Sequence, residues 1–316
     1  MIDYVKLEHE NKKHGDYVVV NWCMGNTCNF ACSYCPTGLH DGTVGWYDVD
    51  DVKSFCTRVI EHYAPKIVYF EFTGGEVTLW KHFKELCKFL SESNAKVGLI
   101  TNGSRTMRYW SELKPYINHV CTSYHPEFSK VDTFLEFIEY LSDDIRVHAN
   151  IMMSPEHFDD CYDVALKVKD IKNISMAMQP LIVDFGDELY EYTDYQQDIL
   201  NRQFALTGAL IVRDKTFESY RGAMSLIDSD GNTMENWAPH RFISQGENSW
   251  VGWKCGAGTE QIVIDMDGSI YRGWCKVGGG LGHINDENLN LPTEQVICDK
   301  NYCHCNFDIM ASKSKD

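Results

Sequence analysis

The chain of 316 residues is strongly acidic, with 46 Asp and Glu against 29 Lys and Arg and a net charge of −17, which disfavours a nucleic-acid partner because phosphate binding needs the opposite sign. Hydrophobic residues at 44% and aromatic residues at 13% exclude a disordered or low-complexity class. No segment resembles a signal peptide or approaches the roughly 20 apolar residues that span a bilayer, so we expect a cytoplasmic protein without a membrane segment.

Between residue 17 and about residue 180, short β-branched runs alternate with segments of helical periodicity. Six strands that alternate with five helices predict an α/β fold in which right-handed βαβ units form a parallel sheet, curled into a partial barrel. Catalytic groups are expected at the carboxyl ends of its strands. The strands are predicted at 17–22, 66–72, 95–101, 118–124, 145–153 and 174–180, and the helices at 48–63, 80–93, 106–116, 130–141 and 155–170.

The alternation ends after residue 181. The acidic and aromatic stretch at 184–204 predicts a helix with its approach loop, Asp230-Gly231 predicts a turn, and 260–274 predicts a hairpin with Asp267-Gly268 at its tip. We therefore divide the chain into an N-terminal extension (1–16), the partial barrel (17–180), a connecting and substrate-proximal region (181–244) and a small cysteine-rich α+β domain (245–316).

Thirteen cysteines in a chain without a secretion signal indicate thiols that are metal-bound, catalytic or buried. Three of them, Cys28, Cys32 and Cys35, follow the first predicted strand with C-x3-C-x2-C spacing. Structural zinc normally takes four ligands, whereas a [4Fe–4S] cluster held by three thiolates leaves one iron open. The spacing favours such a cluster, and a zinc site is the alternative.

This cysteine triplet resembles that of the radical S-adenosylmethionine (radical SAM) superfamily. Tyr34 stands where that family usually carries an aromatic residue, and the stretch TGGE follows the second predicted strand. The resemblance implies that SAM chelates the open iron and that an electron donor such as flavodoxin or ferredoxin reduces the cluster. It also implies that a 5′-deoxyadenosyl radical then abstracts a hydrogen atom from the substrate. Cofactor-binding residues implied by the resemblance are Tyr34, Thr73, Gly74, Gly75, Glu76, Asn102, Ser123 and Asn150.

A second group of cysteines lies near the C-terminus, where two of them flank the predicted hairpin. The arrangement resembles the Twitch and SPASM domains of radical SAM enzymes, although it has fewer cysteines than full SPASM. The resemblance implies one auxiliary cluster, of the [4Fe–4S] type, and leaves open which four of the five thiols bind it. The fifth is either a buried cysteine or a hydrogen-atom donor. The candidate ligands are Cys255, Cys275, Cys298, Cys303 and Cys305.

His125 lies just past the fourth predicted strand and is our candidate catalytic residue, with a loop histidine that orients Pro126 as the alternative. We expect oxidation or epimerisation of a small polar metabolite, such as a sugar or aminosugar. A maturase of ribosomal peptides is the alternative, disfavoured because only 27 residues precede Cys28. A protein that binds zinc at both cysteine groups and is not an enzyme is a third hypothesis.

Overall fold

The computed structural model describes residues 3–185, 188–207, 222–237, 239–244 and 246–315. Its larger sheet has nine strands, of which six form a parallel array in chain order. In spatial order the strands are β13 (Gly280–His283), β12 (Ser269–Tyr271), β11 (Gln261–Ile264), β2 (Tyr17–Cys23), β3 (Ile67–Thr73), β4 (Ala95–Thr101), β5 (His119–Tyr124), β6 (Arg146–Met153) and β7 (Ile174–Pro180).

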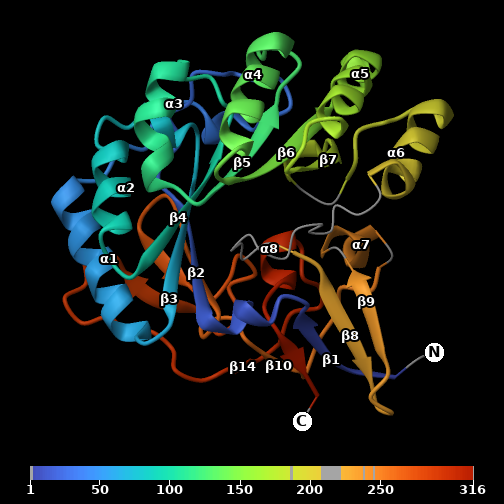
Figure 1. Cartoon of the computed structure of the whole chain (residues 1–316). Helices are drawn as coiled ribbons and strands as arrows, with labels where there is room; N and C mark the ends of the chain where they lie inside the picture. The colour runs from blue at the N-terminus through green and yellow to red at the C-terminus, as the bar shows by residue number, and fades with distance from the viewer. Residues whose placement is uncertain (1–2, 186–187, 208–221, 238, 245, 316) are drawn as a thin grey trace.

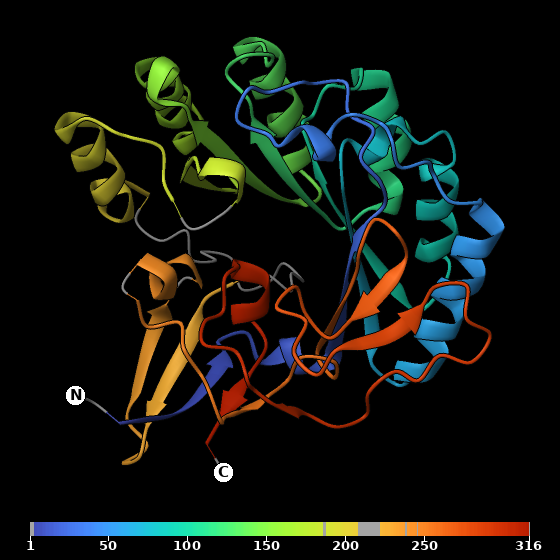
Figure 2. The ribbon, with the colours of Figure 1, turned by 180° about the vertical axis from the view of Figure 1, so that it is seen from behind.

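Five helices connect the parallel strands and cover one face of this sheet (Figures 1 and 2). The six predicted strands and five predicted helices are therefore confirmed, with boundaries that differ by a few residues. The helices are α1 (Val49–Tyr63), α2 (Phe83–Ser91), α3 (Met107–Leu113), α4 (Val131–Ser142) and α5 (Phe158–Lys169).

The alternation of side chains along β2 explains how the sheet joins two cores. Val18, Val20 and Trp22 are fully buried against the helices, in the same core as Phe55 of α1. Successive side chains of a strand point to opposite faces, so Val19 enters a different core, on the other side of the sheet. Each large apolar side chain buried in this way contributes about 1.5–3 kcal/mol to stability.

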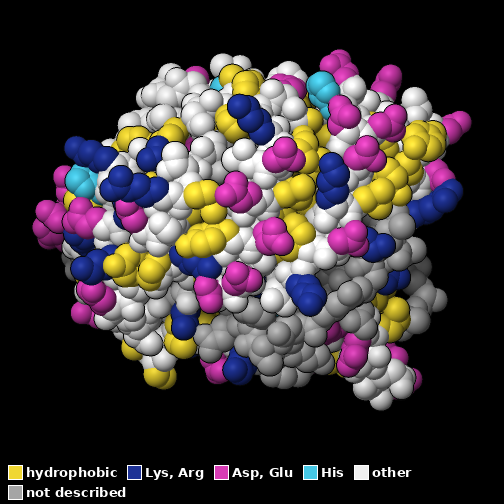
Figure 3. All heavy atoms as spheres, turned by 45° about the horizontal axis from the view of Figure 1, so that its top comes forward, with side chains coloured by type: hydrophobic (Ala, Val, Ile, Leu, Met, Phe, Trp, Pro, Cys, Tyr) yellow, Lys and Arg dark blue, Asp and Glu magenta, His cyan; other side chains and the backbone are white. Residues whose placement is uncertain are grey.

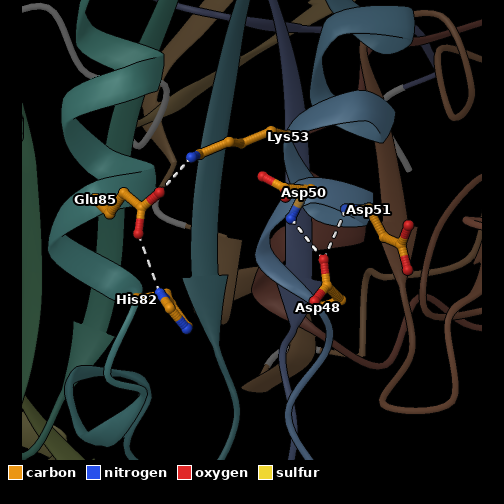
Figure 4. A network of polar contacts seen from close by, with 6 residues as sticks. All are labelled: Asp48, Asp50, Asp51, Lys53, His82 and Glu85. Atoms are coloured by element: carbon orange, nitrogen blue, oxygen red, sulfur yellow. Dashed lines mark hydrogen bonds and ion pairs between the residues drawn. The ribbon is translucent and has the colours of Figure 1, made fainter.

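Polar contacts fix the start of α1 against α2 (Figure 4). The carboxylate of Asp48 accepts hydrogen bonds from the backbone N–H groups of Asp50 and Asp51, which is the usual role of Asp before the first turn of a helix. Five residues further along, Lys53 pairs with Glu85 of α2. This start of α1 closes the long loop that leaves β2.

A second, six-stranded sheet packs on the face of the main sheet that lacks helices. Leu7 and Met224 of this sheet share a core with Val19 and Tyr69 of the main sheet. All its strand pairs are antiparallel. In spatial order the strands are β14 (Val296–Ile297), β10 (Lys254–Cys255), β15 (Lys313–Ser314), β1 (Tyr4–His9), β8 (Met224–Asp228) and β9 (Thr233–Trp237). Three further helices are α6 (Asp194–Thr207), α7 (Pro239–Ser244) and α8 (Asn306–Ile309).

The predicted turns at Asp230-Gly231 and Asp267-Gly268 are confirmed, since both glycines adopt positive φ between antiparallel strands. The hairpin strand β11, however, lies parallel to β2 and extends the main sheet. It thereby covers an edge of β2 that would otherwise present unpaired backbone groups.

Strand β1 belongs to the segment 1–16 that we describe as an extension, yet it pairs with β8 and β15. Strands of 245–316 also contribute to both sheets. The boundaries of the four segments stay predictions, and part of the connecting segment 181–244 lies outside the described residues.

Charged and apolar side chains share the surface of the molecule. On the face shown in Figure 3, acidic and basic side chains are interspersed with apolar ones. None of the described helices is long and apolar enough to cross a membrane.

Candidate active site

The cysteine loop, residues 24–35, leaves the carboxyl end of β2 and lies on the glycine-rich segment that follows β3. Three backbone hydrogen bonds dock the two segments, so the start of the loop continues the parallel ladder of β2 and β3. They join Met24 N to Thr73 O (2.8 Å), Gly75 N to Gly25 O (2.8 Å) and Glu76 N to Thr27 O (2.7 Å).

The two glycines of TGGE are required by this close approach. A Cβ atom on Gly74 would lie 2.4 Å from the carbonyl oxygen of Gly25, and Gly74 adopts a φ of +138° that other residues rarely adopt. A Cβ atom on Gly75 would lie 2.3 Å from the carbonyl oxygen of Thr27. The two glycines thus allow the backbone of the TGGE segment to pack directly against the backbone of the cysteine loop.

Glu76 is fully buried, and its carboxylate joins the end of β3 to the end of β4. It accepts hydrogen bonds from the backbone and hydroxyl of Thr78, from the Thr101 hydroxyl at 2.9 Å and from Asn102 N at 2.7 Å. Burial raises the pKa of Glu76, and these hydrogen bonds oppose that shift. Contact between Glu76 and SAM stays a prediction.

Asn102 also reaches the cysteine loop. Its side-chain amide lies 3.0 Å from Asn29 Oδ1 and 3.8 Å from Cys28 Sγ. The amide is therefore beside the first of the three thiols, where the resemblance places a cofactor contact.

The three thiols of the loop interact with one another. Burial raises the pKa of Cys28, Cys32 and Cys35, to about 12 for Cys32, where negative charge on Glu127 and the other two thiols adds to the shift. Within the described ranges, no three His, Cys, Asp or Glu side chains are arranged to hold a single metal ion. In a [4Fe–4S] cluster each cysteine binds a different iron, and three thiols on one loop fit that cofactor.

His125, at the end of β5, contacts this loop directly. Its Nδ1 lies 2.8 Å from the Tyr34 hydroxyl and 3.5 Å from Cys32 Sγ, and its ring stacks on Tyr34. Burial lowers the pKa of His125 to about 4, so the ring is neutral at physiological pH. The structure thus brings the predicted catalytic histidine to the cysteine loop, and its part in catalysis stays a prediction.

A second contact from the same segment was missed by sequence reasoning. Glu127 accepts hydrogen bonds from the backbone N–H of Ser33 at 2.9 Å and from its hydroxyl at 2.5 Å. Phe128 stacks on Phe30 at 5.1 Å. The only available signal was an acidic residue two positions after His125, just past a strand.

Ser123 and Asn150 are opposite each other on β5 and β6. The Asn150 amide lies 3.1 Å from His148 Nε2 and 3.4 Å from Cys121 Sγ, and His148 Nδ1 lies 2.9 Å from Ser175 Oγ on β7. These polar side chains point to the sheet face opposite α1–α5. His148 and Ser175 were not among the predicted residues, although polar residues at alternate positions of β6 could have indicated them.

The five C-terminal cysteines lie close together. Cys255, Cys275 and Cys298 share one apolar cluster, and Cys303 and Cys305 belong to the adjacent core. Cys303 interacts electrostatically with each of the other four thiols. Burial raises its pKa to about 12. Four of these thiols are sufficient for a fully ligated cluster, so the donor set fits the auxiliary group.

A hydrogen-bonded chain links this C-terminal group to the main sheet. Buried Asp308 accepts from Trp274 N at 3.0 Å and from Cys275 N at 2.7 Å. The indole N–H of Trp274 donates to Asn21 Oδ1 at 3.0 Å, and the Asn21 amide donates to Glu71 at 2.6 Å. Sequence reasoning predicted neither Asp308 nor Asn21, because isolated polar residues carry no local pattern.

Comparison with known proteins agrees with this arrangement. The family model described as the Radical SAM superfamily matches residues 22–168, which include the cysteine loop, the glycine-rich segment and strands β3–β6. The chain contains a radical SAM domain.

A search of curated proteins gives a shorter match. The chain resembles GTP 3′,8-cyclases of Actinobacillus pleuropneumoniae strains, with 32% identity over 97 residues for two of them. This match covers 29% of the chain and 28% of the cyclase, so the chain spans less than a third of the length of these curated relatives.

Solved structures resemble a larger share of the chain. Native anSMEcpe with bound AdoMet has a TM-score of 0.52 at 19% identity, over 85% of this chain and 78% of that one. SuiB of Streptococcus suis, bound to its precursor peptide SuiA, has a TM-score of 0.54 at 14% identity, over 87% and 65%. At these identities the likeness shows a shared fold.

Proposed function

We propose that this chain is a radical SAM enzyme that oxidises or epimerises a small polar metabolite, such as a sugar or aminosugar. The observation that carries the proposal is the cysteine loop, with its three interacting thiols, seated at the carboxyl ends of parallel strands inside the matched domain. When bound, a [4Fe–4S] cluster on Cys28, Cys32 and Cys35 and its SAM supply the 5′-deoxyadenosyl radical that abstracts a hydrogen atom.

Residues around the loop have separate tasks in this proposal. Gly74 and Gly75 hold the loop in place through their backbones. Asn102, which follows β4, and Ser123 and Asn150, which pair across β5 and β6, bind SAM. Stacked against His125, Tyr34 shields the thiol of Cys32 from water.

The polar face of β5–β7 supports a substrate with several hydroxyl or amino groups. His148 and Ser175 offer donors and acceptors that are already fixed by hydrogen bonds to each other and from His148 to Asn150. Side chains held in this way do not lose further rotamer freedom when a polar substrate binds.

The C-terminal thiols are proposed to hold an auxiliary [4Fe–4S] cluster on four of the five cysteines, which pack in two apolar clusters: Cys255, Cys275 and Cys298 in one, and Cys303 and Cys305 in the other. Cys28 follows the carboxyl end of β2, whereas Cys255 and Cys275 lie at the open end of the hairpin β11–β12, near the start of β2. The hydrogen-bonded contact of Trp274 with Asn21 joins this group to the polar face of the sheet. A fully ligated cluster there would accept the electron of an oxidised substrate.

Modification of a peptide is the second candidate function. It is favoured by two solved neighbours whose structures contain peptides, SuiB with its precursor peptide and anSMEcpe with the Cp18Cys peptide.

Product analysis in D2O separates the two reactions proposed for a metabolite. Solvent deuterium at the reacting carbon indicates epimerisation through a thiol, and its absence indicates oxidation.

The proposal is tested by 5′-deoxyadenosine formation from SAM after anaerobic reconstitution with iron and sulfide and reduction with dithionite. We expect product from the wild type and from Cys23→Ala, a matched control for a cysteine at the end of β2. We expect none from the Cys28/Cys32/Cys35→Ala variant. Equal formation in all three proteins, or none in any, would contradict the proposal.

A further inference from the structure

Lys313, on β15, carries a positive charge inside the protein. Its side chain is buried, with 1% of the residue exposed. The Nζ atom lies 2.9 Å from the carbonyl oxygen of Asp308, 3.1 Å from that of Ile309 and 2.7 Å from that of Ala311. Carbonyl oxygens only accept, so three N–H groups are needed, and only the protonated ammonium has three.

The surroundings of this ammonium stabilise it only in part. It lies over the ring of Trp250, 4.8 Å from the centroid, which is a favourable cation–π arrangement. Within the described part of the chain, no carboxylate forms an ion pair with Nζ. A buried charge is unfavourable unless an opposite charge compensates for it, so the question is which anion lies nearby.

The acidic groups nearby are buried Asp308, whose carboxylate accepts hydrogen bonds from Trp274 N and Cys275 N, and thiols of the C-terminal group. Lys313 and Cys255 are directly opposite each other on the antiparallel strands β15 and β10, an arrangement that places their side chains on the same face of the sheet. Cys303 packs in the same apolar cluster as Trp250, whose ring the ammonium faces. The ammonium is therefore close to ligand candidates from two separate segments.

We propose that Lys313 is a positioning residue that supplies the fixed counter-charge of the auxiliary cluster, through the thiolates of Cys255 and Cys303. Four thiolates give such a cluster a net negative charge that grows when it takes up an electron. A fixed positive charge nearby therefore favours the reduced state and raises the reduction potential. The inference rests on the auxiliary cluster of the proposed function, and it assigns Lys313 a role that a lysine serving only to hold α8 would not have.

The test uses the full chain in the Cys28/Cys32/Cys35→Ala background, so that only the auxiliary cluster contributes to the spectra. Lys313→Met removes the charge and keeps the length of the side chain. Lys315→Met is the matched control, because Lys315 follows two residues later, lies 5.0 Å from the centroid of Trp253 and is exposed over 42% of its side chain. Iron content, the urea midpoint of the apoprotein and the midpoint potential from an EPR-monitored redox titration are measured for each protein.

We expect Lys313→Met to lower the potential by about 59 mV, which is a tenfold change for a one-electron couple, and Lys315→Met to leave it unchanged. Loss of iron from Lys313→Met would also support the proposal if its apoprotein unfolds at the same urea concentration as the control. A Lys313→Met protein with full iron content and an unchanged potential would overturn it.

If Lys313→Met does not fold, Lys313→Gln retains two N–H donors to the carbonyl oxygens but carries no charge. The same lowered potential is then expected, and an unchanged one overturns the proposal. If the triple-cysteine background binds no iron although the wild type does, the auxiliary cluster itself is absent. That result would contradict the auxiliary cluster of the proposed function. It differs from the result that would overturn the role of Lys313, which is a bound cluster whose potential is the same with and without the lysine.

Discussion

The close contact between Gly75 and the cysteine loop yields a quantitative prediction. In Gly75→Ala the new Cβ would lie 2.3 Å from Thr27 O, 2.5 Å from Thr27 C and 2.8 Å from Asn26 C, all of them backbone atoms that cannot rotate away. Overpacking of this kind costs about 1–3 kcal/mol. The loop must also shift, which weakens the Gly75-to-Gly25 and Glu76-to-Thr27 hydrogen bonds at about 1 kcal/mol each. The expected loss of stability is therefore about 3–5 kcal/mol.

Gly38→Ala is the matched control, since a Cβ there meets no atom within 4 Å and Gly38 lies shortly after the loop. Urea unfolding of the apoproteins, followed by circular dichroism, gives the stabilities, and iron analysis after reconstitution reports cluster binding. We expect Gly75→Ala to unfold at lower urea concentration and to bind less iron, while Gly38→Ala behaves as wild type. If the loop detaches without global unfolding, the iron is lost alone. Identical urea midpoints and iron contents for the two variants would refute the role of Gly75 in seating the loop.

Two further predictions concern other contacts. Glu127→Ala removes the hydrogen bonds to Ser33 and so loosens the cysteine loop. The absorbance of the reconstituted cluster should then bleach in air several-fold faster than in Glu136→Ala, a control at an exposed site. Equal rates would show that the contact between Glu127 and Ser33 does not protect the cluster. Burial lowers the pKa of His14, which stacks on His9, to about 4. Between pH 6.5 and 4 the unfolded chain therefore binds more protons than the folded chain. The folded state thus loses stability as the pH falls through that window. Lowering the pH from 7 to 5 should therefore destabilise the wild type by about 2 kcal/mol more than His14→Phe in urea titrations; parallel pH dependences would contradict this.

The helices and parallel strands could be predicted because their signals are local. β2 combines β-branched residues with flanking polar turns, and α1 repeats apolar residues at helical spacing behind the capping residue Asp48. The cysteine loop was equally accessible, because its three ligand candidates lie within eight residues of the chain.

Long-range pairings could not be predicted in the same way. β11 joins β2 across about 240 residues of sequence, and no local pattern of apolar residues specifies which distant strand covers an open edge. The strand β1 was missed for the same reason.

Buried polar residues were a second source of error. The sequence carries no signal for a buried lysine, because lysine is usually exposed. The packing of β15 between β1 and β10 buries Lys313. Glu127 and Asp308 acquire their partners only when distant segments meet.

The central claim is that the chain holds one cluster on the cysteine loop and another on the C-terminal thiols. The most direct test is the iron and acid-labile sulfide content per chain, measured after anaerobic reconstitution of the wild type and of the Cys28/Cys32/Cys35→Ala variant. Two [4Fe–4S] clusters predict about eight irons in the wild type and about four in the variant. Zinc in place of iron, or an iron content that the three substitutions leave unchanged, would contradict the account.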